Sequence, residues 1–100
     1  MSEPSEAVDD EVLRLRRQGQ AYARISRELG LDRAADAQQA FRRAVRRLPA
    51  PDAEQAREEE LSRLDRLALR VRADTSKNDI DRARQLKTIE RMRGQIHHDN

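Results

Sequence analysis

The sequence predicts an all-α protein, with a three-helix domain in its first half and an antiparallel helical hairpin in its second half. Two observations lead to this prediction. Apolar residues recur every three or four positions, which is the period of an amphipathic helix, and glycine, proline or polar clusters separate these stretches. A third observation concerns assembly. With 36% apolar residues, 40% charged residues, one Phe, one Tyr and no Trp, the chain is lean for a packed monomer.

The first half of the chain is expected to fold as one domain over residues 6–48, after a disordered segment at residues 1–5. Its first helix, residues 6–18, has acidic residues in its first turns and arginines in its last turns, an order that suits the helix dipole. Three of its apolar residues share one face by their spacing: Val8, Val12 and Leu15.

Two further helices are expected to follow within this domain. The second spans residues 21–29, and its inward residues recur at four-residue spacing: Ala21, Ile25 and Leu29. Gly30 can adopt the positive φ that ends a helix, and Asp32 is a good N-cap for the third helix. That helix should end near Leu48, because Pro49 disfavours helix in the residue before it. Its inward residues are Ala37, Ala40, Phe41, Ala44, Val45 and Leu48.

A short helix, a tight corner at Gly30 and an arginine-rich helix are together typical of a helix-turn-helix, whose second helix enters the DNA major groove. Between Val12 and Leu48 the chain carries ten arginines against three acidic residues, whereas the charges between Pro51 and Asn100 balance. This asymmetry indicates one module that binds a polyanion and one that packs. The alternative is an ordinary three-helix bundle with a solvated arginine face.

The expected DNA contacts lie on the outer face of the third helix and at the start of the second. Arginine suits guanine and glutamine suits adenine in the major groove. The residues expected to reach base edges are Arg33, Gln38, Gln39, Arg42 and Arg43. The residues expected to contact phosphates are Tyr22, Arg24, Arg46 and Arg47.

The second half is expected to be a stiff proline hinge at residues 49–51 followed by a helical hairpin at residues 52–96. A capping-box pattern at residues 52–55 begins its first helix, which should end near Ala73. Its second helix should follow a polar turn and reach about Arg93.

The apolar residues of this last helix recur every three positions, so they drift around the helix and one neighbour cannot cover them. We therefore expect a homo-oligomer. Its contacts should come from Leu64, Leu67, Val71, Ile80, Leu86, Ile89 and Met92.

The sequence gives no support for other classes of protein. It has no cysteine, which excludes disulfides and Cys-ligated metals. No apolar run approaches the roughly 18–20 residues of a membrane span, and the acidic N-terminus lacks the features of a signal peptide. His97 and His98 have no third ligand in view. We expect no metal, no cofactor, no membrane partner and no enzymatic activity, because no residues are arranged for catalysis.

Two stretches resemble known families. Residues 20–30, followed by an alanine-rich helix, resemble the helix-turn-helix of many bacterial and phage DNA-binding proteins. Residues 57–67, with residues 80–82 and 87–92, resemble the helical hairpin that follows the DNA-binding domain in phage small terminase subunits. This second resemblance implies recognition of packaging DNA, a hairpin that supports ring assembly and a large ATPase–nuclease subunit as partner. It also implies a cytoplasmic location in a bacterial or phage-infected cell.

We therefore expect a non-catalytic protein that binds double-stranded DNA as an oligomer, selecting its sequence or structure. Two alternatives remain open. One is a bacterial transcription regulator or nucleoid-associated protein. The other is a protein-binding adaptor that uses the C-terminal hairpin.

Overall fold

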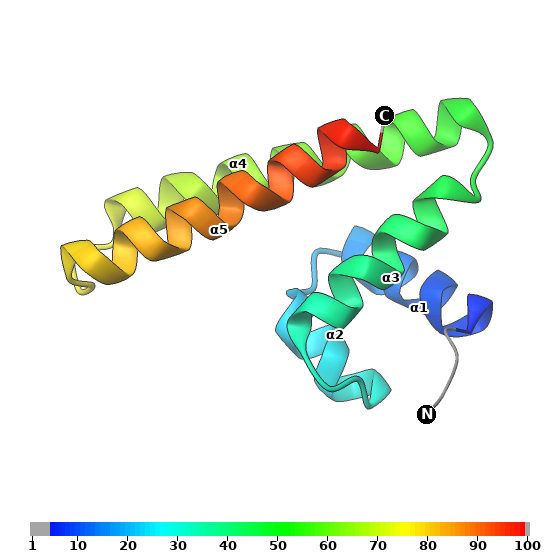
Figure 1. Cartoon of the computed structure of the whole chain (residues 1–100), viewed down its shortest axis with the longest axis horizontal. Helices are drawn as coiled ribbons and strands as arrows, with labels where there is room; N and C mark the ends of the chain where they lie inside the picture. Colours follow the sequence, from blue (N-terminus) through cyan, green and yellow to red (C-terminus); the bar gives the residue numbers. More distant parts are fainter. Residues whose placement is uncertain (1–4, 100) are drawn as a thin grey trace. The chain divides into compact units, whose positions relative to one another are not determined.

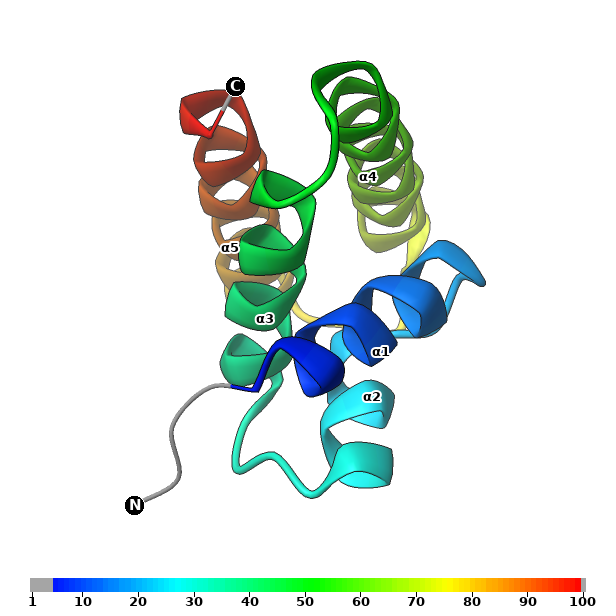
Figure 2. The same ribbon diagram turned by 90° about the vertical axis from the view of Figure 1, so that its right-hand side faces the viewer.

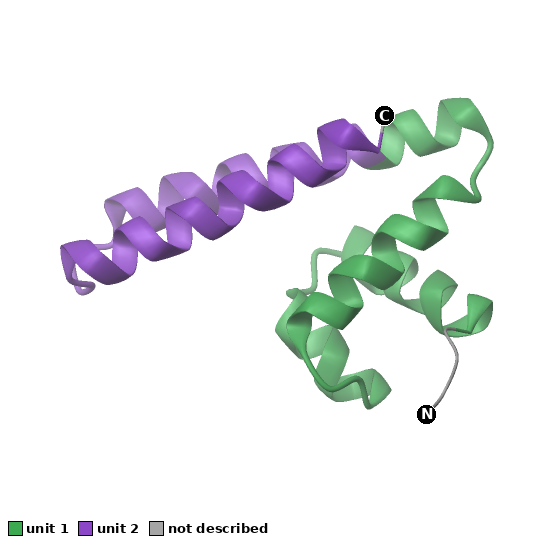
Figure 3. Ribbon diagram, in the orientation of Figure 1, with its two compact units in different colours: residues 1–56 green, residues 57–100 purple. Residues whose placement is uncertain are grey.

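The chain is all-helical in the computed structural model, which describes residues 5–99 (Figure 1). The five helices within this range are α1 (Glu6–Arg17), α2 (Tyr22–Leu29), α3 (Ala34–Arg46), α4 (Ala50–Ala73) and α5 (Asp79–His98). The chain divides into two compact units, residues 1–56 and residues 57–100, with the boundary inside α4 (Figure 3). The all-α class predicted from the apolar spacing is confirmed.

α1 begins and ends close to its predicted limits. Most of the segment expected to be disordered, residues 1–4, lies outside the described residues. Ser5 does not fit that expectation, because its side chain caps α1: the hydroxyl accepts a hydrogen bond from the backbone N–H of Val8 (3.4 Å). A serine at this position satisfies one of the N–H groups that a helix start leaves without a partner.

The turn between α2 and α3 is held by one glycine and one buried serine. Gly30 has φ 72° and ψ 27°, the left-handed conformation that ends α2. The N–H of Leu31 donates to the carbonyl of Ser26 (2.9 Å), and the Ser26 hydroxyl donates to the carbonyl of Arg33 (2.7 Å). These bonds close the corner from both sides and fix the start of α3 relative to the end of α2.

The prediction that Asp32 caps α3 is wrong. The N-cap position is Arg33, whose backbone N–H donates to the Asp36 carboxylate (3.1 Å). The N–H of Asp36 in turn donates to the Arg33 carbonyl (3.0 Å). The carboxylate therefore serves the helix start from within its first turn, where negative charge is favoured by the helix dipole.

The core of the first unit lies where α3 packs against both α1 and α2 (Figures 1 and 2). Its edge-to-face aromatic pair joins Tyr22 and Phe41, with ring centroids 6.2 Å apart and planes at 72°. The guanidinium of Arg16 lies over the Tyr22 ring, 3.9 Å from its centroid. The remaining buried apolar residues of α1, α2 and α3 are Val12, Leu13, Leu15, Ile25, Ala37, Ala40, Ala44 and Val45.

The inward face of α2 is rotated from the predicted one. Ala21 is exposed and precedes the helix, whereas Tyr22 is buried in its place. An aromatic ring removes far more apolar area from water than a methyl group, so burial of Tyr22 decides the orientation. Three residues predicted to be internal are only half-buried: Val8, Leu29 and Leu48.

The expected hinge at residues 49–51 is mostly helical. α4 begins at Ala50, and the N–H of Ala53 donates to the carbonyl of Pro49 (2.9 Å). Pro51 fits into the first turn because that turn needs no backbone N–H from it and its fixed φ is helical. The non-helical link after α3 is therefore residues 47–49, and Asp52 lies inside α4.

In the second unit, α4 and α5 share an apolar core. Its buried members are Leu64, Ala68, Val71 and Ile89. The side chain of Asn78 begins α5 by accepting a hydrogen bond from the N–H of Asp81 (2.8 Å). α5 continues to His98, past the predicted end near Arg93, because Gly94 is accommodated within the helix.

Two glycine substitutions should have opposite effects on stability. Gly30→Ala should lower the free energy of unfolding by about 1 kcal/mol, since φ is 72° and a side chain rarely adopts it. Gly94→Ala should raise it by up to roughly 1 kcal/mol, because Gly94 lies in a helix and a Cβ there would meet nothing within 4 Å. Urea unfolding followed by circular dichroism measures both. Equal stability of the two variants would contradict this account of the corner.

Candidate nucleic-acid interface

A buried carboxylate joins α1 to α3. The side chain of Asp9 is only 3% exposed. Arg43 donates two hydrogen bonds to the Asp9 carboxylate, one from Nε and one from Nη2, at 3.0 Å each. Arg47 adds a third hydrogen bond to Asp9 at 3.2 Å. Its other nitrogen, Nη2, donates to Asp10 at 3.1 Å and to the backbone carbonyl of Glu6 at 3.4 Å. We call these residues the Asp9 clamp: Asp9, Asp10, Arg43 and Arg47.

The clamp changes the acidity of Asp9. Burial alone would raise the pKa of the Asp9 carboxyl, but the hydrogen bonds and charges of Arg43 and Arg47 outweigh burial and hold that pKa below its ordinary value. The charged form of Asp9 is therefore the one that the fold stabilises. Without the two guanidinium groups, a buried carboxylate would be strongly destabilising.

Two of the predicted DNA-contacting arginines thus have a structural role. Arg43 was expected to reach base edges and Arg47 to contact phosphate, but both side chains are about one-third exposed and directed to carboxylates of α1. In the sequence alone, the acidic start of α1 indicates only a favourable interaction with the helix dipole. The fold places that acidic turn beside α3, so we remove Arg43 and Arg47 from the candidate surface.

The same arrangement alters the charge of the first unit. Between Val12 and Leu48 the sequence has a large excess of arginine, but residues 1–56 as a whole hold ten arginines and ten carboxylates. The range from Val12 to Leu48 has an excess of arginine because it does not include the acidic residues at the start of α1. Those acidic residues are the partners of Arg43 and Arg47. The positive charge of this unit is therefore confined to part of its surface.

Tyr22 is also not part of the candidate surface, because it is buried. It was expected to contact phosphate from the start of α2, but it is only 7% exposed and its ring contacts Phe41 and Arg16. Its aromatic contacts make it a core residue. Ser26 likewise acts within the fold, through its hydrogen bond to the α2–α3 turn.

The two remaining arginines at the ends of helices are exposed and form surface ion pairs. Arg24 in α2 is 64% exposed and pairs with Glu28 at 3.1 Å, one helical turn further on. Arg33 at the start of α3 is 75% exposed and lies 3.7 Å from Asp36. Exposed pairs of this kind contribute little to stability, so either arginine can exchange its carboxylate for another anion at small cost.

The outer face of α3 carries the other predicted residues. Ala35, Gln39, Arg42 and Arg46 follow at spacings of four, three and four, which aligns them along the helix. We call these four residues the α3 ridge. Gln39 and Arg46 are exposed and Arg42 is half-buried. Gln38 lies beside the ridge and is also half-buried.

The seven residues expected to mediate oligomerisation fall into three groups. Three are buried in the core that α4 and α5 share: Leu64, Val71 and Ile89. Three are partly buried against that core: Leu67, Leu86 and Met92. Ile80 is 71% exposed. A charge introduced at Ile89 would therefore disrupt the unit itself and would not report on association.

Residues 5–99 include no cluster of three or more His, Asp or Glu residues with the geometry of a metal site. In the same range, no helix combines the length and apolar character that crossing a membrane requires. No protein-family model, curated protein or solved structure matches this chain. The α2–α3 turn and the α3 ridge are therefore the features of this chain that bear on its function.

Disrupting the Asp9 clamp should make the first unit less stable and change its response to acid. Because the pKa of Asp9 is lower in the folded chain, its contribution is fully present above the unfolded pKa and is lost as pH falls below about 4. Asp9→Asn should lower the unfolding free energy at pH 7 by about 2 kcal/mol and flatten the loss of stability in acid.

The matched control is Asp10→Asn. Asp10 is 66% exposed and pairs with Arg47 at the surface, so this substitution should cost less than about 0.5 kcal/mol. Urea unfolding between pH 3 and pH 7 compares the two variants with the native chain. Equal stability of Asp9→Asn and Asp10→Asn at pH 7 would show that the clamp does not hold α1 to α3.

Proposed function

We propose that this chain is a non-catalytic double-stranded DNA-binding protein in which α2 and α3 form a helix-turn-helix. The observation that carries the proposal is the α3 ridge, which presents Gln39, Arg42 and Arg46 on the outer face of the helix that follows the Gly30 corner. α2 has eight residues, and the link to α3 has four, Gly30–Arg33, which is the length that this motif uses. In such motifs the second helix enters the major groove.

Each part of the proposed interface has a different task. Gln39 and Arg42, with Gln38 beside them, have the amide and guanidinium groups that can form paired hydrogen bonds with adenine or guanine. Arg46 lies one turn beyond Arg42, where it would contact phosphate. Arg24 and Arg33 are exposed and can add phosphate contacts from the ends of α2 and α3. Ala34 and Ala35 keep the start of α3 narrow enough to approach DNA closely.

The charge of the first unit limits how strongly one copy can bind. Because its arginines and carboxylates are equal in number, we expect only about three phosphate contacts and a shallow salt dependence, with a slope of roughly −3 in log K against log salt. A single copy would therefore bind weakly. Association of the second unit as a helical hairpin would raise the effective concentration of neighbouring copies and so compensate.

The biological setting is part of the same proposal. The sequence resembles phage small terminase subunits, in which a helical hairpin follows a DNA-binding domain. That setting would give the chain a large ATPase–nuclease subunit as partner. A bacterial transcription regulator or nucleoid-associated protein would use the same interface. A gene for a large ATPase–nuclease subunit beside this one would favour the first setting.

A protein-binding adaptor is the second candidate function. The observation that favours it is the balance of charge in residues 1–56, which gives no general attraction for polyanions. An adaptor would bind its target through the second unit, and substitutions in the α3 ridge would have no effect on that binding.

The test of DNA binding is the double variant Arg42→Ala with Arg46→Ala. It should bind duplex DNA about tenfold or more weakly at low salt. The salt slope should fall by only roughly 1, because Arg46 contacts phosphate whereas Arg42 contacts a base edge. The melting temperature of the variant is measured as well, so that a loss of folding is distinguished from a loss of binding. Fluorescence anisotropy with a pool of random-sequence duplexes measures affinity and slope.

The matched control is Arg66→Ala with Arg70→Ala, which removes two exposed arginines from α4 in the second unit. DNA affinity of this control should stay within about twofold of the native value. Equal losses in both double variants would point to attraction that is not specific to α3. If the native chain binds no duplex at about 50 mM salt, the proposal of DNA binding is wrong.

A further inference from the structure

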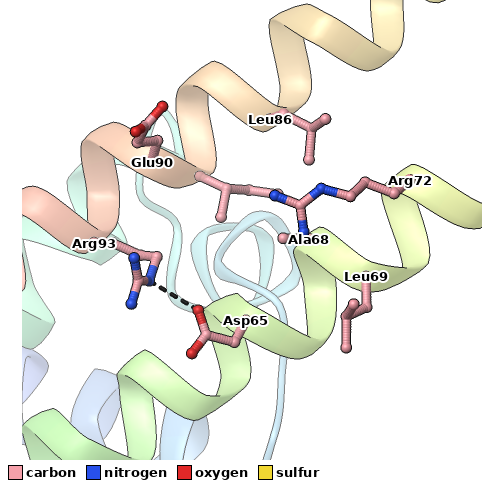
Figure 4. A pocket seen from close by; sticks show the side chains of 8 residues that line it. Asp65, Ala68, Leu69, Arg72, Leu86, Glu90 and Arg93 are labelled. Atoms are coloured by element: carbon pink, nitrogen blue, oxygen red, sulfur yellow. Dashed lines mark ion pairs between the residues drawn. The ribbon is translucent and has the colours of Figure 1, made fainter.

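The pair of helices α4 and α5 leaves an open groove along one side of its shared core (Figure 4). The groove has a volume of about 350 Å³, and its apolar lining comes from Ala68 and Leu69 of α4 and from Leu86 and Ile89 of α5. Leu69 is 63% exposed although it lies beside this apolar surface. Two helices alone cannot cover such a surface, because each buries only the face turned to the other.

Charged side chains of both signs border the groove. Asp65 and Arg93 form an ion pair across α4 and α5 at 2.8 Å. Arg72 and Glu90 also line the groove, and within residues 5–99 neither forms an ion pair. The border therefore carries two positive and two negative groups, an arrangement that a second copy of the same surface can match.

The spacing along α4 points to a particular match. Asp65 and Arg72 lie seven residues apart, which places them on the same side of the helix. The midpoint between them falls between Ala68 and Leu69. Ala68 is small, whereas Leu69 is large and exposed. An antiparallel copy of α4 centred on this midpoint brings opposite charges together and places each leucine over an alanine.

We propose that a second copy of this chain covers the groove through a two-fold axis that passes between Ala68 and Leu69, with the two α4 helices antiparallel. Asp65 then faces the partner's Arg72, and Arg72 faces the partner's Asp65. Leu69 packs over the partner's Ala68, where the small side chain leaves room for it. The contact is isologous, so each pair occurs twice and the interface closes on itself.

The opposite side of the two helices does not have this symmetry. It has a second groove of about 350 Å³, whose apolar lining includes Leu67, Val71 and Met92. The only charged residue in its lining is Arg84. Two copies joined there would place like charges against one another, so charge complementarity selects the groove that contains Leu69.

This inference rests on the self-association part of the proposed function and makes it specific, but it does not depend on DNA. Association is measured without DNA, and DNA binding is measured with variants of α3. A chain that dimerises but binds no duplex retains the inference and loses the DNA proposal. If the chain binds duplex DNA as a monomer, the DNA proposal is retained and the inference of a two-fold dimer is lost.

The sharpest test uses engineered cysteines, because the native chain has none. In the double variant Asp65→Cys with Arg72→Cys, the two positions are about 10.5 Å apart along one helix, beyond the roughly 7 Å between Cα atoms that a disulfide can span. A bond can therefore form only between chains. Oxidation should convert most of this variant to a covalent dimer on a non-reducing gel.

The controls are the two single variants. In the proposed arrangement, Asp65 lies farther from the partner's Asp65 than from its own Arg72, because the distance between the two helices adds to the rise along the helix. Asp65→Cys alone and Arg72→Cys alone should therefore form little dimer. The inference is overturned if the single variants crosslink as well as the double variant. It is also overturned if the double variant does not crosslink at a concentration where the native chain is dimeric.

Leu69→Glu and Ile80→Glu form a second matched pair, since both leucine and isoleucine are exposed and neither change should reduce the helix content seen by circular dichroism. Leu69→Glu should weaken dimerisation by about tenfold or more, because it removes two buried leucines from each dimer. Ile80→Glu should leave it unchanged. Sedimentation equilibrium measures both, and a native chain that is monomeric at about 100 µM overturns the inference.

Discussion

The Asp9 clamp is the interaction on which the first unit depends. A carboxylate that is 3% exposed is tolerated only because Arg43 and Arg47 supply three hydrogen bonds and two positive charges. These contacts join α1 to α3 across more than thirty residues of sequence and fix the rotation of α3 about its own axis. The clamp therefore decides which residues of α3 face outward, and it also removes two arginines from the charge available for binding.

α3 has three faces, and each has a different role. Its buried alanines, Ala37, Ala40 and Ala44, form the core with Phe41, α1 and α2. Arg43 and Arg47 occupy the edge that faces α1, and the α3 ridge occupies the side opposite the core. Ser26 and Gly30 fix the corner before the helix, so the ridge is carried on a rigid element. A binding surface positioned in this way loses little conformational entropy when it meets a partner, which favours selectivity even where few charges are available.

Apolar spacing was sufficient to predict the helical class, and it placed the starts of α1 and α2 to within one residue, because burial of one face sets helix position. The role of individual arginines could not be predicted in the same way, since Arg42 and Arg43 are neighbours in sequence but lie on different sides of α3. One signal for the clamp was present: Asp9, Val12 and Arg16 share a helical face, so Asp9 lies on the buried side of α1. The burial of Tyr22 was not predicted, because its size, more than the four-residue spacing of Ala21, orients α2.

The symmetry of the proposed contact has a consequence for how copies could assemble on DNA. A two-fold interface closes after two copies, whereas a ring requires a surface that meets a different surface on the next copy. If α4 pairs with its own copy around Ala68 and Leu69, that groove is occupied and cannot also propagate a ring. Ring assembly would then need the groove lined by Leu67, Val71 and Met92, which has a single sign of charge and so favours a differently charged surface.

A protein limited to the two-fold contact would instead present two α3 ridges related by symmetry, which matches a target made of two inverted half-sites. The type of contact that the second unit forms would thus distinguish a regulator from a packaging ring, even though both would read DNA with the same residues of α3.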